Sequence, residues 1–323
     1  MTNFVCNGSF TDTHIFHAGA KYLEAGDIVR SARVCKLWNT LTQDQRIWKN
    51  LFEIEGIPPV IGSTDEERDY RKDFIAMYRM TRVSGRTIKN TFGEMIGKVP
   101  SISEEHFNKL KQRDPFEKEK SMEENYVCVV VPHSIKRAGL PLALDESGNL
   151  TELSKQNEHS ENRELTIPFS LKNLKLLSSY LPTNKKNTSI FTKDSLSLVF
   201  NQCDAQPKEN KVYFIRKGIV GRGIHSYTDH EEILHSNGFE IAPLRGLALF
   251  YSIEKLTYST DLDEHYAINP DTISYCNKIY RSVIGLESGR EIEVGIHYCY
   301  DADDLGVVPC ISVGNGEQQK FLK

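Results

Sequence analysis

The segment VCKLWNTLTQDQRIWKNLF, which spans Val34–Phe52, contains both tryptophans of the 323-residue chain, Trp38 and Trp48. Tryptophan side chains usually anchor a core or an interface, because they bury a large apolar area. Around them, apolar residues recur at helical spacing over residues 12–55, and Gly56 suits the end of the last helix. The spacing predicts a compact unit of three helices, near the lower size limit for stability on its own.

Length and charge exclude several classes of protein. A chain of 323 residues is longer than one core usually sustains, so the sequence predicts more than one domain. The formal net charge of −4 argues against a nucleic-acid-binding protein. No apolar run reaches the length of about 18 residues that a membrane span needs. The first residues also lack the basic and apolar regions of a secretory signal. We expect no nucleic-acid partner and no membrane partner.

Cysteine, histidine and glycine spacings offer no metal or cofactor site. The seven cysteines form no C-x-x-C pair, which is typical of thiols in a reducing compartment, so we expect a cytoplasmic protein. His225, His230 and His235 recur every five residues and therefore do not share one helix face. The glycines of residues 218–223 lack the G-x-G-x-x-G spacing of a dinucleotide loop and favour a turn. We expect no cofactor and no metal.

The pattern divides the chain into a helical unit at residues 10–56, a helical bridging region at 57–120 and an α+β domain at 121–323. The bridging region includes residues 101–124, of which 12 of 24 are charged, a density that supports little core. The fold class predicted for the whole chain is α+β, with an all-α N-terminal unit. The patterns predict helices at 65–83, 169–181, 228–239 and 243–259, and strands at 126–132, 211–219, 290–301 and 305–314.

Two local signals make these expectations more specific. Thr228 and Glu231 have the spacing of a capping box at the start of a helix, and Gly238 suits the position just after its end. Residues 290–301 alternate strictly between apolar and polar, which is typical of a half-buried strand. We expect this strand to pair with residues 305–314.

The N-terminal unit resembles an F-box. Residues 27–30 read Asp-Ile-Val-Arg, residues 34–38 read Val-Cys-Lys-Leu-Trp, and residues 47–49 read Ile-Trp-Lys. F-boxes show this order: an acidic-aliphatic-aliphatic start, then Val-Cys-basic-x-Trp, then aliphatic-Trp-Lys. F-boxes usually also begin with Leu-Pro, whereas residues 9–13 here read Ser-Phe-Thr-Asp-Thr. We expect Phe10 to supply the apolar contact at that position.

The resemblance implies a docking function and a set of contact residues. F-boxes are helical modules that bind Skp-type adaptors of cullin–RING ubiquitin ligases. A small helical unit that cannot bury all of its apolar surface is stabilised when a partner covers that surface. This agrees with a docking role. By resemblance, the residues that meet the adaptor are Phe10, Ile15, Phe16, Leu23, Ile28, Val34, Cys35, Leu37, Trp38 and Trp48.

Residues 114–132 and 212–234 are loosely similar to uncharacterised C-terminal regions of F-box proteins from chlamydia-like intracellular bacteria. This second resemblance implies a bacterial effector that acts in the cytosol of a eukaryotic host, because bacteria lack the ligase. The function expected for the whole chain is therefore a non-enzymatic adaptor that recruits an unknown target protein for ubiquitination.

Three alternatives remain at this stage. The two tryptophans can simply fill a helical core. The helical unit can serve as an intramolecular lid over the second domain of a scaffold protein. The third alternative is a thiol hydrolase that uses Cys299 or Cys310 with His297, since His297 and Cys299 share one strand face. No third group that would orient such a pair is evident.

Overall fold

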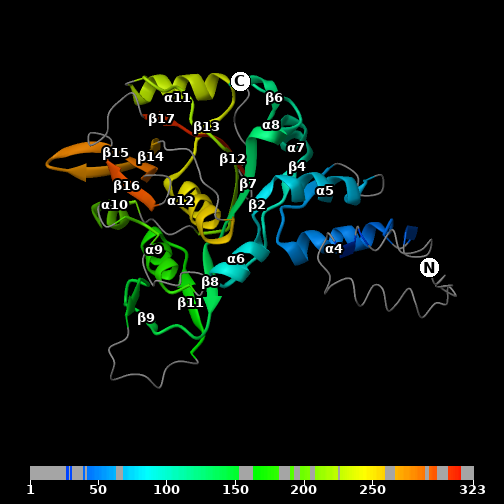
Figure 1. Cartoon of the computed structure of the whole chain (residues 1–323), viewed down its shortest axis with the longest axis horizontal. Helices are drawn as coiled ribbons and strands as arrows, with labels where there is room; N and C mark the ends of the chain where they lie inside the picture. Colours follow the sequence, from blue (N-terminus) through cyan, green and yellow to red (C-terminus); the bar gives the residue numbers. More distant parts are fainter. Residues whose placement is uncertain are drawn as a thin grey trace.

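The computed structural model confirms the predicted α+β fold class, with helices packed against two larger sheets (Figure 1). Among the described residues, no helix combines the length and the apolar character that a membrane crossing needs. The structure describes residues 27–28, 30, 39–40, 42–62, 68–152, 163–181, 190–192, 197–203, 208–224, 226–258, 266–287, 291–296 and 305–313.

The central sheet has five strands in the order β13-β18-β12-β7-β2. Strand β7 (Tyr126–Val131) is buried along its whole length, as its run of β-branched residues predicts. Strand β12 (Lys211–Arg216) is antiparallel to both β7 and β18 (Pro309–Val313), whereas β2 (Thr81–Val83) is parallel to β7. Strand β13 (Glu240–Ile241) closes the other edge. Segments from residue 81 to residue 313 therefore share one sheet.

The second sheet has the order β16-β15-β14-β17. Strands β14 (Tyr266–Tyr275) and β15 (Lys278–Glu287) form a long hairpin, which turns at Cys276 and Asn277 with φ angles of 51° and 60°. The side chain of Ile279, just beyond the turn, is 78% exposed.

The predicted pairing of residues 290–301 with 305–314 is wrong. Strand β16 (Glu291–Ile296) pairs with β15 instead. The later segment divides at Val308 into β17 (Leu305–Val307), which lies parallel to β14, and β18, which joins the central sheet. Alternation specifies the buried face of a strand but not its partner, and the long β15 strand takes the position beside β16.

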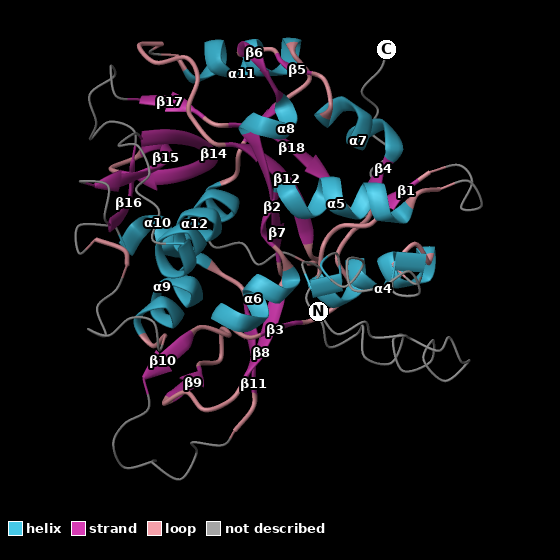
Figure 2. Cartoon of the chain, turned by 45° about the vertical axis from the view of Figure 1, so that its right-hand side comes forward, coloured by secondary structure: helices cyan, strands magenta, loops and turns pink. Residues whose placement is uncertain are grey.

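Helix α12 (Leu244–Ile253) lies between the two sheets and contacts both, as Figures 1 and 2 show. All its residues except Arg245 are buried, which confirms the predicted apolar helix. A Cβ atom at Gly246 would lie 3.4 Å from the Ile215 side chain, so the helix packs against β12 at ordinary van der Waals distance. The helix continues as a π-helical turn, η2 (Glu254–Tyr258).

Two predicted helices begin or end elsewhere. Helix α5 (Tyr70–Met80) is shorter than the predicted helix at 65–83, because the chain then enters strand β2. Helix α11 (Tyr227–Ser236) begins before Thr228, since the Ser226 side chain accepts the backbone N–H of Asp229. The predicted Thr228–Glu231 capping box is therefore wrong, whereas Gly238 follows the helix with φ of 72°, as expected.

The charged stretch at 101–124 folds rather than remaining open. The Asp114 carboxylate is fully buried and accepts hydrogen bonds from Arg216 Nε at 3.0 Å and Asn125 Nδ2 at 2.7 Å. Long-range partners thus pair the buried carboxylate, and the apolar residues of the same run, Ile102, Phe107, Leu110 and Met122, are buried in the core. The remaining elements are β1 (Val60–Ile61), α6 (Gly85–Thr91), β3 (Glu94–Met95), β4 (Ile102–Ser103), α7 (Glu104–Leu110), β5 (Arg113–Asp114), β6 (Glu117–Ser121), α8 (Met122–Asn125), β8 (Ser134–Arg137), β9 (Leu142–Leu144), β10 (Leu150–Glu152), β11 (Leu165–Pro168), α9 (Leu171–Ser179) and α10 (Ser197–Gln202).

Candidate functional site

Helix α4 (Gln45–Glu55) carries the second half of the tryptophan-rich segment. It begins where the Asp44 side chain accepts the backbone N–H of Arg46 at 2.9 Å. It ends at Gly56, whose φ of 61° is the left-handed conformation that favours glycine. The apolar residues buried on this helix are Ile47, Trp48, Leu51 and Phe52.

Trp48 is fully buried and is fixed by partners within the chain. Its Nε1–H donates a hydrogen bond to the carbonyl oxygen of Thr42 at 2.7 Å. Its ring lies 5.6 Å from the ring of Phe74 on α5, and the Arg71 guanidinium lies 5.7 Å from the Trp48 ring centroid. Phe52 meets the same Phe74 ring edge-on at 5.1 Å. Aromatic contacts therefore hold α4 against α5.

The end of α4 is joined to the start of α6 by a close backbone contact. The Gly85 N–H donates to the Gly56 carbonyl oxygen at 2.8 Å. A Cβ atom at Gly56 would lie only 2.4 Å from the Gly85 Cα, so neither chain segment has room for a side chain there. Beside this contact, Arg86 Nη1 donates to the buried Glu55 carboxylate at 2.6 Å. We call these contacts with α5 and α6 the α4 junction.

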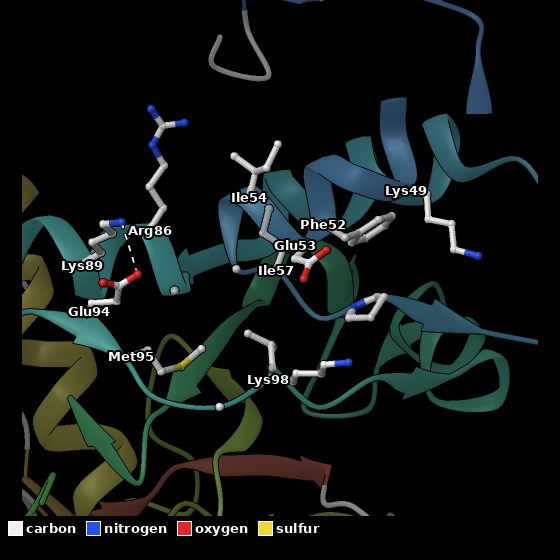
Figure 3. A pocket seen from close by; sticks show the side chains of 15 residues that line it. Lys49, Phe52, Glu53, Ile54, Ile57, Arg86, Lys89, Glu94, Met95 and Lys98 are labelled. Atoms are coloured by element: carbon white, nitrogen blue, oxygen red, sulfur yellow. Dashed lines mark hydrogen bonds and ion pairs between the residues drawn. The ribbon is translucent and has the colours of Figure 1, made fainter. Parts of the chain in front are cut away.

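An open groove lies beside the α4 junction, between α4, the start of α6 and residues 94–99 (Figure 3). Its cavity volume is about 710 Å³. The exposed Lys89–Glu94 pair lies at one end of the view and Lys49 at the other. No sequence pattern predicts this groove, because three separate segments contribute its walls. The apolar residues that line it are Phe52, Ile54, Ile57, Pro59, Met95 and Val99.

Two of the ten predicted adaptor-binding residues lie within the described part of the chain. Ile28 and Trp48 are both fully buried. Asp27 and Arg30, on either side of Ile28, form an exposed ion pair at 2.5 Å. The adaptor-binding role of all ten residues stays a prediction. The residues outside the described ranges are Phe10, Ile15, Phe16, Leu23, Val34, Cys35, Leu37 and Trp38.

One of the three residues proposed for thiol chemistry lies within the described part of the chain. Cys310 is fully buried in β18, between β12 and β13. Burial raises the pKa of its thiol well above the ordinary value, and the nearby Glu240 carboxylate raises it further. A thiol in this setting is protonated at neutral pH and is a poor nucleophile. Cys299 and His297 lie outside the described residues.

The described residues contain no group of three or more His, Cys, Asp or Glu side chains arranged to hold a metal ion. Gly221 and Gly223 have φ angles of 72° and 78°, so the glycine-rich segment forms a turn as the sequence predicts.

Comparison with known proteins gives one match. Neither the curated proteins nor the solved structures include a chain that matches this one. The likeness of the C-terminal part to regions of bacterial F-box proteins therefore stays a prediction. Residues 13–54, which include most of α4, match the family model described as F-box-like, so the chain carries an F-box-like domain in its N-terminal part.

Proposed function

We propose that this protein is a substrate-recruiting adaptor, which docks through its F-box-like domain to a Skp-type subunit of a cullin–RING ubiquitin ligase. The F-box-like match at residues 13–54 carries the proposal, because such domains generally bind Skp-type adaptors. In this proposal, residues 10–56 dock to the ligase and residues 121–323 bind the target. Residues 57–120 connect these two parts of the chain.

The α4 junction supports this division of roles. An adaptor must hold its target at a fixed position relative to the ligase, so the docking module needs a stiff attachment to the rest of the chain. Trp48 and Phe52 pack against Phe74, and Gly56 touches Gly85, so α4 has contacts on two neighbouring helices. Close-packed contacts of this kind transmit position, because packed cores deform little.

The decisive experiment is calorimetric titration of the full-length chain with a purified Skp-type adaptor. We expect binding in the wild-type chain. Changing Trp38 to Ala should weaken it by about 2 kcal/mol or more, since truncated aromatic anchors are typical hot spots. Ile279→Ser is the matched control, because this side chain is 78% exposed on the distant hairpin. Circular dichroism of each variant separates lost binding from lost folding. No binding by the folded wild-type chain at tens of micromolar contradicts the proposal.

We further propose that the α+β region binds its target and does no chemistry of its own. The buried, protonated state of the Cys310 thiol supports this part. Target ubiquitination, measured with the reconstituted ligase, should be unchanged in Cys310→Ser and in Cys299→Ser. If either change abolishes ubiquitination while folding and adaptor binding persist, the thiol-hydrolase alternative with His297 replaces this proposal.

The proposed site of action is a eukaryotic cytosol, where Skp-type adaptors operate. A bacterial origin with delivery into a host rests only on the resemblance of residues 114–132 and 212–234 noted above. An epitope-tagged chain expressed in eukaryotic cells should fractionate with cytosolic proteins and co-precipitate a cullin. Recovery in a membrane or chromatin fraction without a cullin contradicts this part of the proposal.

A further inference from the structure

The groove beside the α4 junction combines an apolar floor with a charged rim. Phe52 and Ile57 form part of the floor and are almost fully buried, whereas Met95 is half-buried. Gly56 and Gly85 also line the groove, where they pack against each other, and Gly97 lines it beside the Asn210 side chain. A ligand that lies here can place apolar side chains against Ile54, which is exposed, and against Met95.

The rim of the groove has an excess of positive charge. Its lining contains four cationic side chains against two carboxylates, in a chain whose net charge is −4. Such a local reversal of sign attracts anionic ligands. The carboxylates are Glu53 and Glu94, and the cations are Lys49, Arg86, Lys89 and Lys98.

Two of these cations are accessible to an incoming anion. Lys89 meets Glu94 only at 3.5 Å, and both side chains are more than 60% exposed, so this pair is weak and exchanges readily with solvent. Lys98 has no carboxylate within 4 Å among the residues that the structure describes. Arg86 differs, because it is held at 2.6 Å by the buried Glu55 carboxylate. The groove thus has available positive charge on α6 and on residues 94–99.

An unpaired strand edge adds a second kind of contact. Strand β3 (Glu94–Met95) is the edge strand of the three-stranded sheet β11-β8-β3, and both of its residues line the groove. Edge strands present backbone N–H and C=O groups that an extended peptide can pair with, and the alternate side chains of such a peptide then occupy pockets on one face.

We propose that this groove binds an extended, acidic peptide segment of the target protein. The segment lies along β3, places apolar side chains on Ile54 and Met95, and directs carboxylates to Lys89 and Lys98. Recruitment for ubiquitination rests on the function proposed above, whereas peptide binding itself does not. This contact adds to the one proposed for the α+β region, because the groove is lined by residues 49–99, and it would hold the target next to the docking module.

The test uses the full-length chain and two fluorescein-labelled nonapeptides. One carries glutamates around two leucines, and in the other lysine replaces each glutamate. Fluorescence polarisation should show binding of the acidic peptide alone, and raising the salt from 0.05 M to 0.5 M should weaken it at least fivefold, as expected for surface charge. Equal binding of the lysine peptide overturns the proposal, and so does no binding of either peptide at hundreds of micromolar.

Charge reversal assigns the site. The double change Lys89→Glu and Lys98→Glu should weaken binding of the acidic peptide at least tenfold. The matched control reverses two exposed lysines that do not line the groove, Lys118→Glu and Lys278→Glu, and should change the affinity less than twofold. Equal losses in both double variants overturn the proposal, because they show a response to net charge alone. Stronger binding of a single-stranded oligonucleotide than of the acidic peptide also overturns it.

Calorimetry with the Skp-type adaptor separates this inference from the function on which it rests. The groove variant should bind the adaptor as the wild-type chain does. If adaptor binding persists while the acidic peptide fails to bind, the groove proposal alone is wrong. If the acidic peptide binds in the groove while the adaptor does not, the groove binds peptides in a protein with another function.

Discussion

Helix α4 has two faces with different surroundings. On one face, Trp48 and Leu51 are at most 1% exposed and pack within the α4 junction. On the other face, Lys49, Glu53 and Ile54 are exposed and line the groove. The two faces lie on one helix of 11 residues, so they share the same backbone and the same caps.

The difference shows how one short helix can serve stability and recognition separately. We call the face with Trp48 and Leu51 the closed face. Buried contacts on this face contribute to folding because water is excluded from them. We call the face with Lys49, Glu53 and Ile54 the open face. Charges on this face are hydrated and contribute little to folding, but they remain available to a partner. Substitutions on the two faces should therefore change different measured quantities.

The largest effect is expected from Trp48→Ala. It removes a fully buried ring that contacts Phe74 and donates to the Thr42 carbonyl, so the free energy of unfolding should fall by about 3 to 5 kcal/mol. Urea unfolding followed by circular dichroism measures this loss. Trp48→Phe keeps a ring but leaves the Thr42 carbonyl without its donor, so its loss should be smaller, about 1 to 2 kcal/mol. A loss below 1 kcal/mol for Trp48→Ala would show that the closed face does not stabilise the chain.

A smaller loss, of about 2 kcal/mol or more, is expected from Gly56→Ala. Its φ of 61° strains an alanine, and the added Cβ atom would overlap the Gly85 Cα. Gly139→Ala is the matched control, because Gly139 has φ of 74° but no heavy atom within 4 Å of the added Cβ. The control should lose about 1 kcal/mol from backbone strain alone. Equal losses for the two variants would contradict a close contact between α4 and α6.

Arg86→Met should have an intermediate effect, because Arg86 belongs to both regions. The substitution leaves the Glu55 carboxylate buried without its cation. The Arg86 side chain is 30% exposed, so solvent partly screens the charge interaction that is lost. We expect the free energy of unfolding to fall by about 1 to 2 kcal/mol. Glu55→Gln together with Arg86→Met should recover part of that loss. A double variant less stable than the single variant would disprove the pairing.

The smallest effects on stability are expected on the open face. Glu53→Ala and Ile54→Ser change exposed positions and should alter the free energy of unfolding by less than about 0.5 kcal/mol. Glu53→Ala should instead strengthen binding of the acidic peptide, because it removes a negative charge from the groove. Unchanged peptide affinity in Glu53→Ala would indicate that the peptide binds elsewhere.

Local patterns in the sequence predict the elements of this fold better than their partners. Gly56 ends α4 and the apolar run at 126–131 forms a buried strand, because each outcome depends on residues close together in the chain. The partner of β16 depends instead on β15, which the alternation of residues 291–296 does not specify. Residues 81–83 continue a helical pattern but form β2, because pairing with β7 overrides it.

The candidate site was predictable to a different degree in its two parts. The F-box-like motif is contiguous, so its spacing of Val-Cys-Lys-Leu-Trp and Ile-Trp-Lys suffices to identify it. The groove is not contiguous, since Phe52, Arg86 and Met95 come from three segments that meet only in the folded chain. The sequence also contains no pattern that predicts the Gly56–Gly85 contact, which brings the end of α4 close to the start of α6.

Because both tryptophans lie in the N-terminal part of the chain, intrinsic tryptophan fluorescence measures changes in that part alone. Light at 295 nm excites tryptophan alone, and both indoles, Trp38 and Trp48, lie within residues 13–54. The indole of Trp48 is shielded from water and hydrogen-bonded, so its emission should be shifted to the blue. In a Trp38→Phe background, intrinsic fluorescence thus follows the attachment of α4 to α5 without any introduced dye.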